Sequence, residues 1–120
     1  MVDEQRPHSV VSRPELRLSI ILGLDDMWHH RPKFQEIVRR ARDAGLAGAS
    51  VWRGVEGYGA SSHIHTARLL DLADGLPVLV VLVDEPERVR GFVDAIAELL
   101  TQATVTLDEV ERLHVSGDQA

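Results

Sequence analysis

The sequence predicts an α+β fold, a ferredoxin-like sandwich in which a four-stranded antiparallel sheet carries two helices on one face. Its strand and helix segments follow the order β-α-β-β-α-β. Two right-handed crossovers then place both helices on the same side of the sheet, with the first and third strands at its centre. The third strand segment, residues 78–83, is apolar at every position, whereas a sheet with one face in water should alternate. We therefore expect a partner subunit to cover the second face.

The first half of the domain follows from alternation and helical spacing. Residues 1–14 are polar, contain two prolines, and are predicted to form a disordered arm. Residues 16–22 alternate between apolar and other side chains, which predicts the first strand. After a loop, Pro32 is well suited to the first turn of a helix, and apolar residues recur at helical spacing as far as Ala44. Gly45 is then expected to cap this helix in a left-handed conformation.

The remaining strands and the second helix are predicted in the same way. Residues 47–53 predict a brief second strand, and residues 76–83 predict the third. Asp84 is expected to begin the second helix in a capping box with Glu87. The last strand is predicted at about residues 110–115.

Length and composition limit the class of protein. The 120 residues suffice for one domain, which we place at residues 15–115, between the arm at 1–14 and a polar tail at 116–120. The absence of cysteine excludes disulfides and thiolate metal sites. The net charge of −6 argues against nucleic acid as a partner. No apolar stretch is long enough to span a bilayer, so we expect no membrane insertion and a cytoplasmic protein.

A glycine- and serine-rich loop between the second and third strands is the strongest candidate for a binding site. Its three glycines allow positive φ, and successive exposed N–H groups can then form a nest for an anion. Serine hydroxyls and the preceding arginine would add further donors. We predict binding of a phosphate or carboxylate, and the alternative is a tight loop that binds nothing. The candidate ligand-binding residues are Arg53, Gly54, Gly57, Tyr58, Gly59, Ser61, Ser62, His65 and Thr66.

Histidines in and near this loop suggest a second kind of site. His63 and His65 are two residues apart, so in an extended segment they share a face and could bind one divalent metal ion. His29 and His30 could join them in the folded chain. The alternative is that these are polar loop histidines bonded to the backbone.

Catalysis has little support in the sequence. The serines show no activating base beyond nearby histidines, and the carboxylates have no diagnostic spacing. We predict that the protein is not an enzyme and that it carries no cofactor.

The stretch around the loop also resembles a known family. It contains GLAGASV at 45–51, RG at 53–54, GYG at 57–59, IHT at 64–66 and VDE at 83–85. These residues resemble the PII signalling proteins and, more closely, their PII-like relatives in domain-of-unknown-function family 190. The resemblance covers about residues 15–115.

Membership of this superfamily implies a homotrimer whose sheets pack around a central axis. It also implies that a nucleotide or another anionic metabolite binds in the clefts between subunits. Residues 54–66 would begin a T-loop that carries the signal to a target protein. The chain departs from PII proteins at Ala60-Ser61, where they have Arg-Gln, and it lacks their basic, glycine-rich phosphate-binding segment at residues 101–109. The resulting hypothesis is a PII-like regulator, and the alternative is a histidine-based metal-binding trimer.

Overall fold

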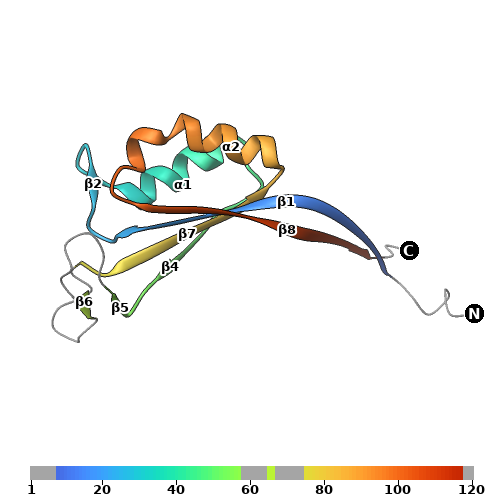
Figure 1. Cartoon of the computed structure of the whole chain (residues 1–120), viewed down its shortest axis with the longest axis horizontal. Helices are drawn as coiled ribbons and strands as arrows, with labels where there is room; N and C mark the ends of the chain where they lie inside the picture. Colours follow the sequence, from blue (N-terminus) through green and yellow to red (C-terminus); the bar gives the residue numbers. More distant parts are fainter. Residues whose placement is uncertain (1–7, 58–64, 67–74, 118–120) are drawn as a thin grey trace, which may run out of the picture.

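The computed structural model, which describes residues 8–57, 65–66 and 75–117, confirms the α+β sandwich (Figure 1). Its main sheet is antiparallel and has the order β4-β7-β1-β8, so the first and third main strands are central, as predicted. Two helices lie on one face of this sheet. The elements are β1 (His8–Gly23), α1 (Lys33–Asp43), β4 (Ser50–Arg53), β7 (Pro77–Asp84), α2 (Pro86–Ala95), a 3₁₀ turn (Ala97–Leu99) and β8 (Thr104–Gly117).

The hydrophobic core lies between the helices and the central strands. Alternate residues of β1 and β7 point toward the helices, and Leu18, Ile20 and Val80 are completely buried there. The helices contribute residues spaced three or four apart, which is the period of a helix face. These core residues from the helical layer are Ile37, Ala41, Val89, Phe92, Ile96 and Leu99.

Helix α1 begins one residue later than predicted and ends where the sequence predicts. Pro32 is the N-cap, in an extended conformation, and Gly45 has φ +79° just beyond the last turn. The Leu46 N–H donates to the Ala41 carbonyl and the Gly45 N–H to the Arg42 carbonyl, which is the Schellman pattern. Neither α1 nor α2, the α-helices in the described part of the chain, has the length and apolarity that a bilayer crossing needs.

The predicted capping box at the start of α2 is wrong. Helix α2 has Glu85 as its N-cap and Pro86 in its first turn, with no side-chain hydrogen bond at the cap. Asp84 is the last residue of β7, and its carboxylate accepts from the backbone N–H groups of Glu85 and Ala47 instead. The extended conformation continues through Glu85, so Asp84 lies one residue before the position from which it could cap the helix.

Strands β1 and β8 are both longer than predicted. Strand β1 begins at His8, so a disordered arm is wrong for residues 8–14; residues 1–7 lie outside the described part. Residues 8–14 pair with 111–117 of β8, which also begins earlier than predicted, at Thr104. In this paired segment each strand provides the backbone hydrogen-bond partners of the other. Pro14 is tolerated because, among the described strands, β8 alone pairs with β1 at that point.

A small hairpin occupies the segment predicted as a loop between β1 and α1. Strands β2 (Met27–Trp28) and β3 (Arg31–Pro32) are joined by His29 and His30, both with positive φ. Two such residues match the twist of the flanking strands in a two-residue turn. The hairpin lies at the N-terminal end of α1 (Figure 1).

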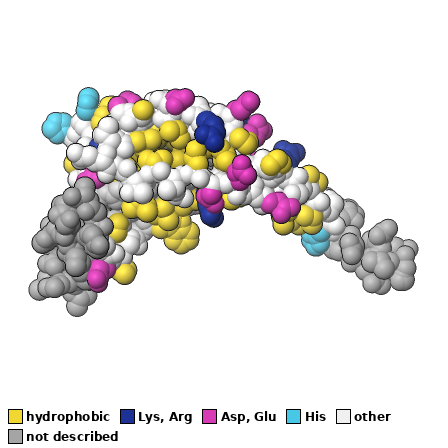
Figure 2. All heavy atoms as spheres, in the orientation of Figure 1, with side chains coloured by type: hydrophobic (Ala, Val, Ile, Leu, Met, Phe, Trp, Pro, Cys, Tyr) yellow, Lys and Arg dark blue, Asp and Glu magenta, His cyan; other side chains and the backbone are white. Residues whose placement is uncertain are grey.

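No described residue covers the sheet face opposite the helices. Ile21 of β1, Leu79 of β7 and Trp52 of β4 are aligned across this face by the strand register. The side chain of Trp52 is 63% exposed and that of Ile21 is 44% exposed. Hydrophobic side chains accordingly appear beneath the sheet in Figure 2. We name Ile21, Trp52, Leu79, Val81 and Val83 the open face.

Candidate functional site

The base of the predicted binding loop is a short ladder. Strands β5 (Glu56–Gly57) and β6 (His65–Thr66) are antiparallel, with Gly57 opposite His65. The structure thus brings together the two ends of the segment that the sequence singled out. The other predicted residues of this loop, Tyr58, Gly59, Ser61, Ser62 and His63, lie outside the described part of the chain, so their binding role stays a prediction.

The two described glycines of the loop serve close packing. Neither Gly54 nor Gly57 has positive φ, so the nest conformation predicted for them is wrong at these two positions. A Cβ on Gly54 would lie 2.7 Å from Cγ of Pro77, and one on Gly57 would lie 3.0 Å from the same atom. The Gly54 N–H also donates to the Pro77 carbonyl at 2.8 Å. Glycine is needed here because the loop base lies directly against the start of β7.

A hollow of about 620 Å³ opens on the same side of the sheet as the open face. Its walls come from three parts of the chain: the segment 47–50 before β4, the end of β7, and the middle of β8 with β1 beside it. Arg17 and Arg112 bring two guanidinium groups to it. We name it the cleft, and its lining is Arg17, Ala47, Gly48, Ala49, Ser50, Val81, Val83, Val110, Glu111 and Arg112.

Both cleft arginines are held by carboxylates. Arg17 forms an ion pair with Asp108 at 2.7 Å, and Arg112 reaches Glu15 at 3.4 Å. These pairs are half-exposed on the arginine side, so an incoming anion could compete for the guanidinium protons. Sequence reasoning missed this cleft because its two arginines are 95 positions apart in the sequence and meet through the β1–β8 register.

Strand β4 connects the cleft to the loop. The segment 47–50 lines the cleft at the start of β4, and Arg53 and Gly54 lie at its other end, at the loop base. Arg53 is exposed there. The cleft wall and the loop base therefore lie at the two ends of one four-residue strand.

Asp84 fixes the cleft wall to the start of α2. Its buried carboxylate accepts from the Ala47 N–H at 2.9 Å and from the Glu85 N–H at 2.7 Å. Arg88 of α2 lies 3.7 Å from the same carboxylate and donates to the carbonyl of Gly45. One acidic side chain thus holds three chain segments together behind the cleft.

Replacing Asp84 with alanine is expected to loosen this wall, because the Ala47 N–H loses its acceptor. A hydrogen bond to a charged group contributes about 1.5–3 kcal/mol of unfolding free energy, and at this part-buried position we expect a loss near the lower end. Urea unfolding checks the stability, and hydrogen exchange at the Ala47 amide checks the location. Asp84→Asn is the control, since its amide oxygen can still accept from Ala47. Unchanged exchange at Ala47 in the alanine variant would contradict this role.

A second charged cluster joins α1 to the β2–β3 hairpin. The Glu36 side chain is only 1% exposed and lies within salt-bridge distance of Arg31 (3.6 Å), Arg39 and Arg40 (2.9 Å). Hydrogen bonds from Arg39 and then Arg40 lower the pKa of Glu36 from 4.5 to about 2. The bond to Glu36 in turn raises the pKa of Arg40 above its ordinary value. Arg40 also lies over the ring of Trp28, 4.8 Å from its centroid.

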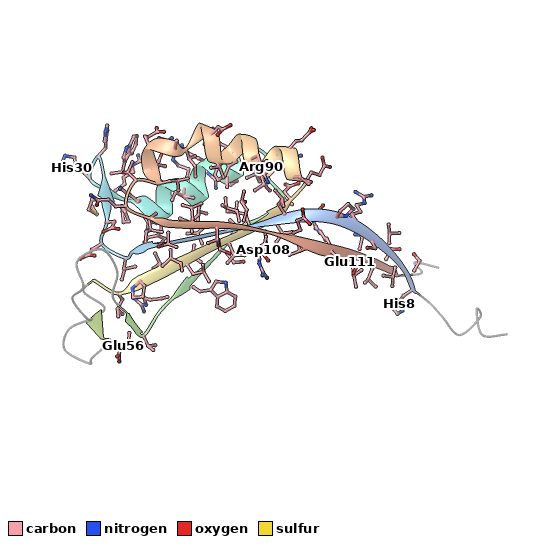
Figure 3. All side chains as sticks on the ribbon, in the orientation of Figure 1. His8, His30, Glu56, Arg90, Asp108 and Glu111 are labelled. Atoms are coloured by element: carbon pink, nitrogen blue, oxygen red, sulfur yellow. The ribbon has the colours of Figure 1, made fainter. Side chains whose placement is uncertain are left out.

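The histidines predicted to bind metal are only partly tested by the structure. His29 stacks on Trp28 with 3.9 Å between ring centroids, and His30 follows it in the hairpin turn (Figure 3). Within residues 8–57, 65–66 and 75–117 no three His, Asp or Glu side chains form a group that could hold a metal ion. His63 lies outside these ranges, so the pair His63 and His65 stays a prediction.

Comparison with known protein sequences identifies relatives over most of the chain. The model of the family DUF190, described as "Uncharacterized ACR", matches residues 15–112. A UPF0166 protein of Aquifex aeolicus (strain VF5) is 32% identical over 98 residues, which are 82% of this chain and 92% of that protein. A second UPF0166 protein of the same organism is 23% identical over 77 residues, covering 64% of this chain and 80% of that one.

Comparison with solved structures supports the same fold. CPII, a nitrogen regulatory PII-like protein from Thiomonas intermedia K12, was solved with ADP, AMP and bicarbonate bound. It has a TM-score of 0.65 at 15% identity, and the match covers 85% of this chain and 91% of that one. Its apo form has a TM-score of 0.59 at 14% identity, over 88% of this chain and 99% of that one. At these identities the likeness concerns the fold.

Proposed function

The chain belongs to the DUF190 family, and on that premise we propose that it is a PII-like regulator that binds a small anionic ligand. The ligand is a nucleotide or a carboxylate-type metabolite, and binding alters the contact of the 54–66 loop with a target protein. The role is binding rather than catalysis. The observation that carries the proposal is the cleft. Arg17 and Arg112 line it together with the start of β4, and the other end of β4 is the base of the loop.

The cleft has the chemistry that a small anion requires. Arg17 and Arg112 offer guanidinium donors, Ser50 offers a hydroxyl, and Gly48 has open space where a Cβ would stand. The apolar walls from Val81 and Val83 suit the rest of a nucleotide or metabolite. The loop residues from Arg53 to Thr66 that the sequence singled out would complete the site from the other end of β4.

We propose that the working form is a homotrimer in which the open face is covered by neighbouring copies. An uncovered sheet face with exposed Trp52 and Ile21 beside half-buried Leu79 and Val81 supports an interface. Because the cleft lies on the same side of the sheet, such packing would place it between subunits. The ligand would then contact two copies, and its binding would be linked to their arrangement.

A thermal-shift panel tests the binding role. We expect ADP, AMP or bicarbonate to raise the melting temperature, and the rise to grow with ligand concentration. A ligand at a hundred times its Kd stabilises the folded state by about 2.7 kcal/mol, which corresponds to a shift of several degrees. Arg112→Ala should reduce the ligand-induced rise in melting temperature. The melting temperature of the ligand-free variant should change by less than this reduction.

The same panel separates the metal-binding alternative. If only Cu²⁺ or Zn²⁺ raises the melting temperature, and His65→Ala removes that rise, the protein is a metal-binding trimer and the regulator proposal is wrong. A flat response to every anion over a wide concentration range would also contradict the proposal.

A further inference from the structure

The paired outer ends of β1 and β8 extend beyond the helices as a two-stranded projection (Figure 1). We name residues 8–15 of β1 and 110–117 of β8 the ribbon arm; the register pairs them residue by residue. A two-stranded ribbon is marginally stable on its own in water, so a ribbon of this length needs a surface to pack against. The family match begins at residue 15 and ends at 112, so most of the ribbon arm lies outside it.

One face of the ribbon arm carries an apolar stripe. Val10 is opposite Val115, and Ser12 is opposite Leu113, so all four side chains share the face that continues the helix-covered side of the sheet. Val10, Leu113 and Val115 are 58%, 55% and 56% exposed. In Figure 2 hydrophobic side chains continue from the body of the protein onto this arm.

Acidic residues border the stripe at its inner end. Glu109 and Glu111 alternate with the same period as Leu113 and Val115, so they lie on the same face of β8. Both are exposed, and Glu111 accepts a hydrogen bond from Ser12. The stripe is therefore apolar at its tip and negative toward the body.

A groove with the opposite charge lies at the other edge of the sheet. It measures about 340 Å³ and runs between α1 and β4. Its floor is apolar, from Phe34, Val38 and Val51, and Arg39 and Arg42 border it. Arg39 is paired with Glu36 and Asp43, so Arg42 is the cation offered to a partner. The side chain of Arg42 is 82% exposed, and its nearest carboxylate, Asp43, is 3.9 Å away. We name it the α1–β4 groove.

We propose that the ribbon arm of one copy docks its apolar face into the α1–β4 groove of a second copy. The apolar stripe of the arm would pack on the apolar floor of the groove, and Glu109 or Glu111 would form an ion pair with Arg42. The arm cannot reach the groove of its own chain, because the sheet order β4-β7-β1-β8 places the groove and the arm on opposite edges. The partner is another copy because one chain carries both complementary surfaces.

This contact joins two different surfaces, so copies linked by it follow one another head to tail, and they form a ring if the rotation between them closes. The docking side chains lie on the helix side of the sheet, opposite the open face, and among them only Glu111 also lines the cleft. The contact goes beyond the proposed function, and its test measures association between copies rather than ligand binding.

Cross-linking between copies tests the docking directly, since the chain has no native cysteine. Leu113→Cys and Gln35→Cys are made in separate chains, mixed by refolding, and treated with a short bis-maleimide. We expect a covalent dimer that contains one chain of each kind. The matched control replaces Leu113→Cys with His114→Cys, on the opposite face of the same strand, and should give several-fold less dimer.

Aspartate substitutions give the second readout. Val115→Asp should abolish the cross-link and weaken self-association in sedimentation velocity. Val11→Asp, at a residue that is 47% exposed on the other face of the arm, should leave both unchanged. Equal dimer yields with Leu113→Cys and His114→Cys, no dimer with either, or equal effects of the two aspartates would each overturn the proposal.

Discussion

Replacing Ile21 and Trp52 together with glutamate is expected to convert the proposed trimer into folded monomers. The two side chains lie on either side of Leu79 on the open face. In a trimer around a central axis, each interface would bury the added carboxylates among the apolar side chains of the open face. An unpaired charge in an interface costs several kcal/mol. Because both side chains are already exposed in a single chain, the substitutions should cost the isolated fold little.

Native mass spectrometry at micromolar concentration measures the outcome. The unmodified protein should appear at three times the 13.3 kDa mass of one chain, and the double variant at one times that mass. Met27→Glu is the matched control, since Met27 is an exposed apolar residue in the β2–β3 hairpin, away from the open face. A monomeric unmodified protein, or a double variant that stays trimeric, would show that the open face is not the interface.

The sequence was sufficient for the sheet order because that order depends on features visible in one segment at a time. Alternation in β1, the apolar run of β7 and the glycine after α1 each predict a local structure, and the handedness of crossovers orders the strands. The ribbon arm was missed because residues 8–14 look like a polar tail until residues 111–117 are known to pair with them. Strand pairing over 100 residues is not visible in either segment alone.

The candidate site was predictable only in part, for the same reason. The loop was found from its own composition, and its base is where the sequence placed it. The cleft was missed because Arg17, Ser50 and Arg112 come from three strands. Gly54 and Gly57 were identified from the expectation of positive φ, which is wrong for both. The actual reason, their contact with Pro77, is not visible in the sequence around them.

Glu36 was missed although a local signal exists. Arg39 and Arg40 follow it at three and four positions, the spacings at which helix side chains meet. What the sequence does not show is that Glu36 is buried, which comes from the packing of α1 against the β2–β3 hairpin. Burial is what distinguishes this cluster from an ordinary surface ion pair.

Glu36→Gln is expected to lower the stability of the protein at neutral pH and to remove part of its acid sensitivity. In the folded protein the pKa of Glu36 is about 2, below its ordinary value of 4.5. The folded state therefore binds the proton less readily than the unfolded chain does. The stabilisation is fully present above about pH 5 and is lost as the pH falls from 4.5 toward 2. Glutamine keeps the shape but leaves three arginines without their shared carboxylate.

Urea unfolding between pH 7 and pH 2.5, at constant protein concentration, tests this expectation. The difference in unfolding free energy between the unmodified protein and Glu36→Gln should be largest at neutral pH and should shrink as the pH falls below 4.5. Glu87→Gln, which replaces an exposed carboxylate in the first turn of α2, is the control and should show a small difference throughout. If this difference in unfolding free energy stayed constant down to pH 2.5, packing of the Glu36 side chain, rather than its charge, would hold α1 against the hairpin. A difference that shrinks would assign the contact to the ion pairs with Arg31, Arg39 and Arg40.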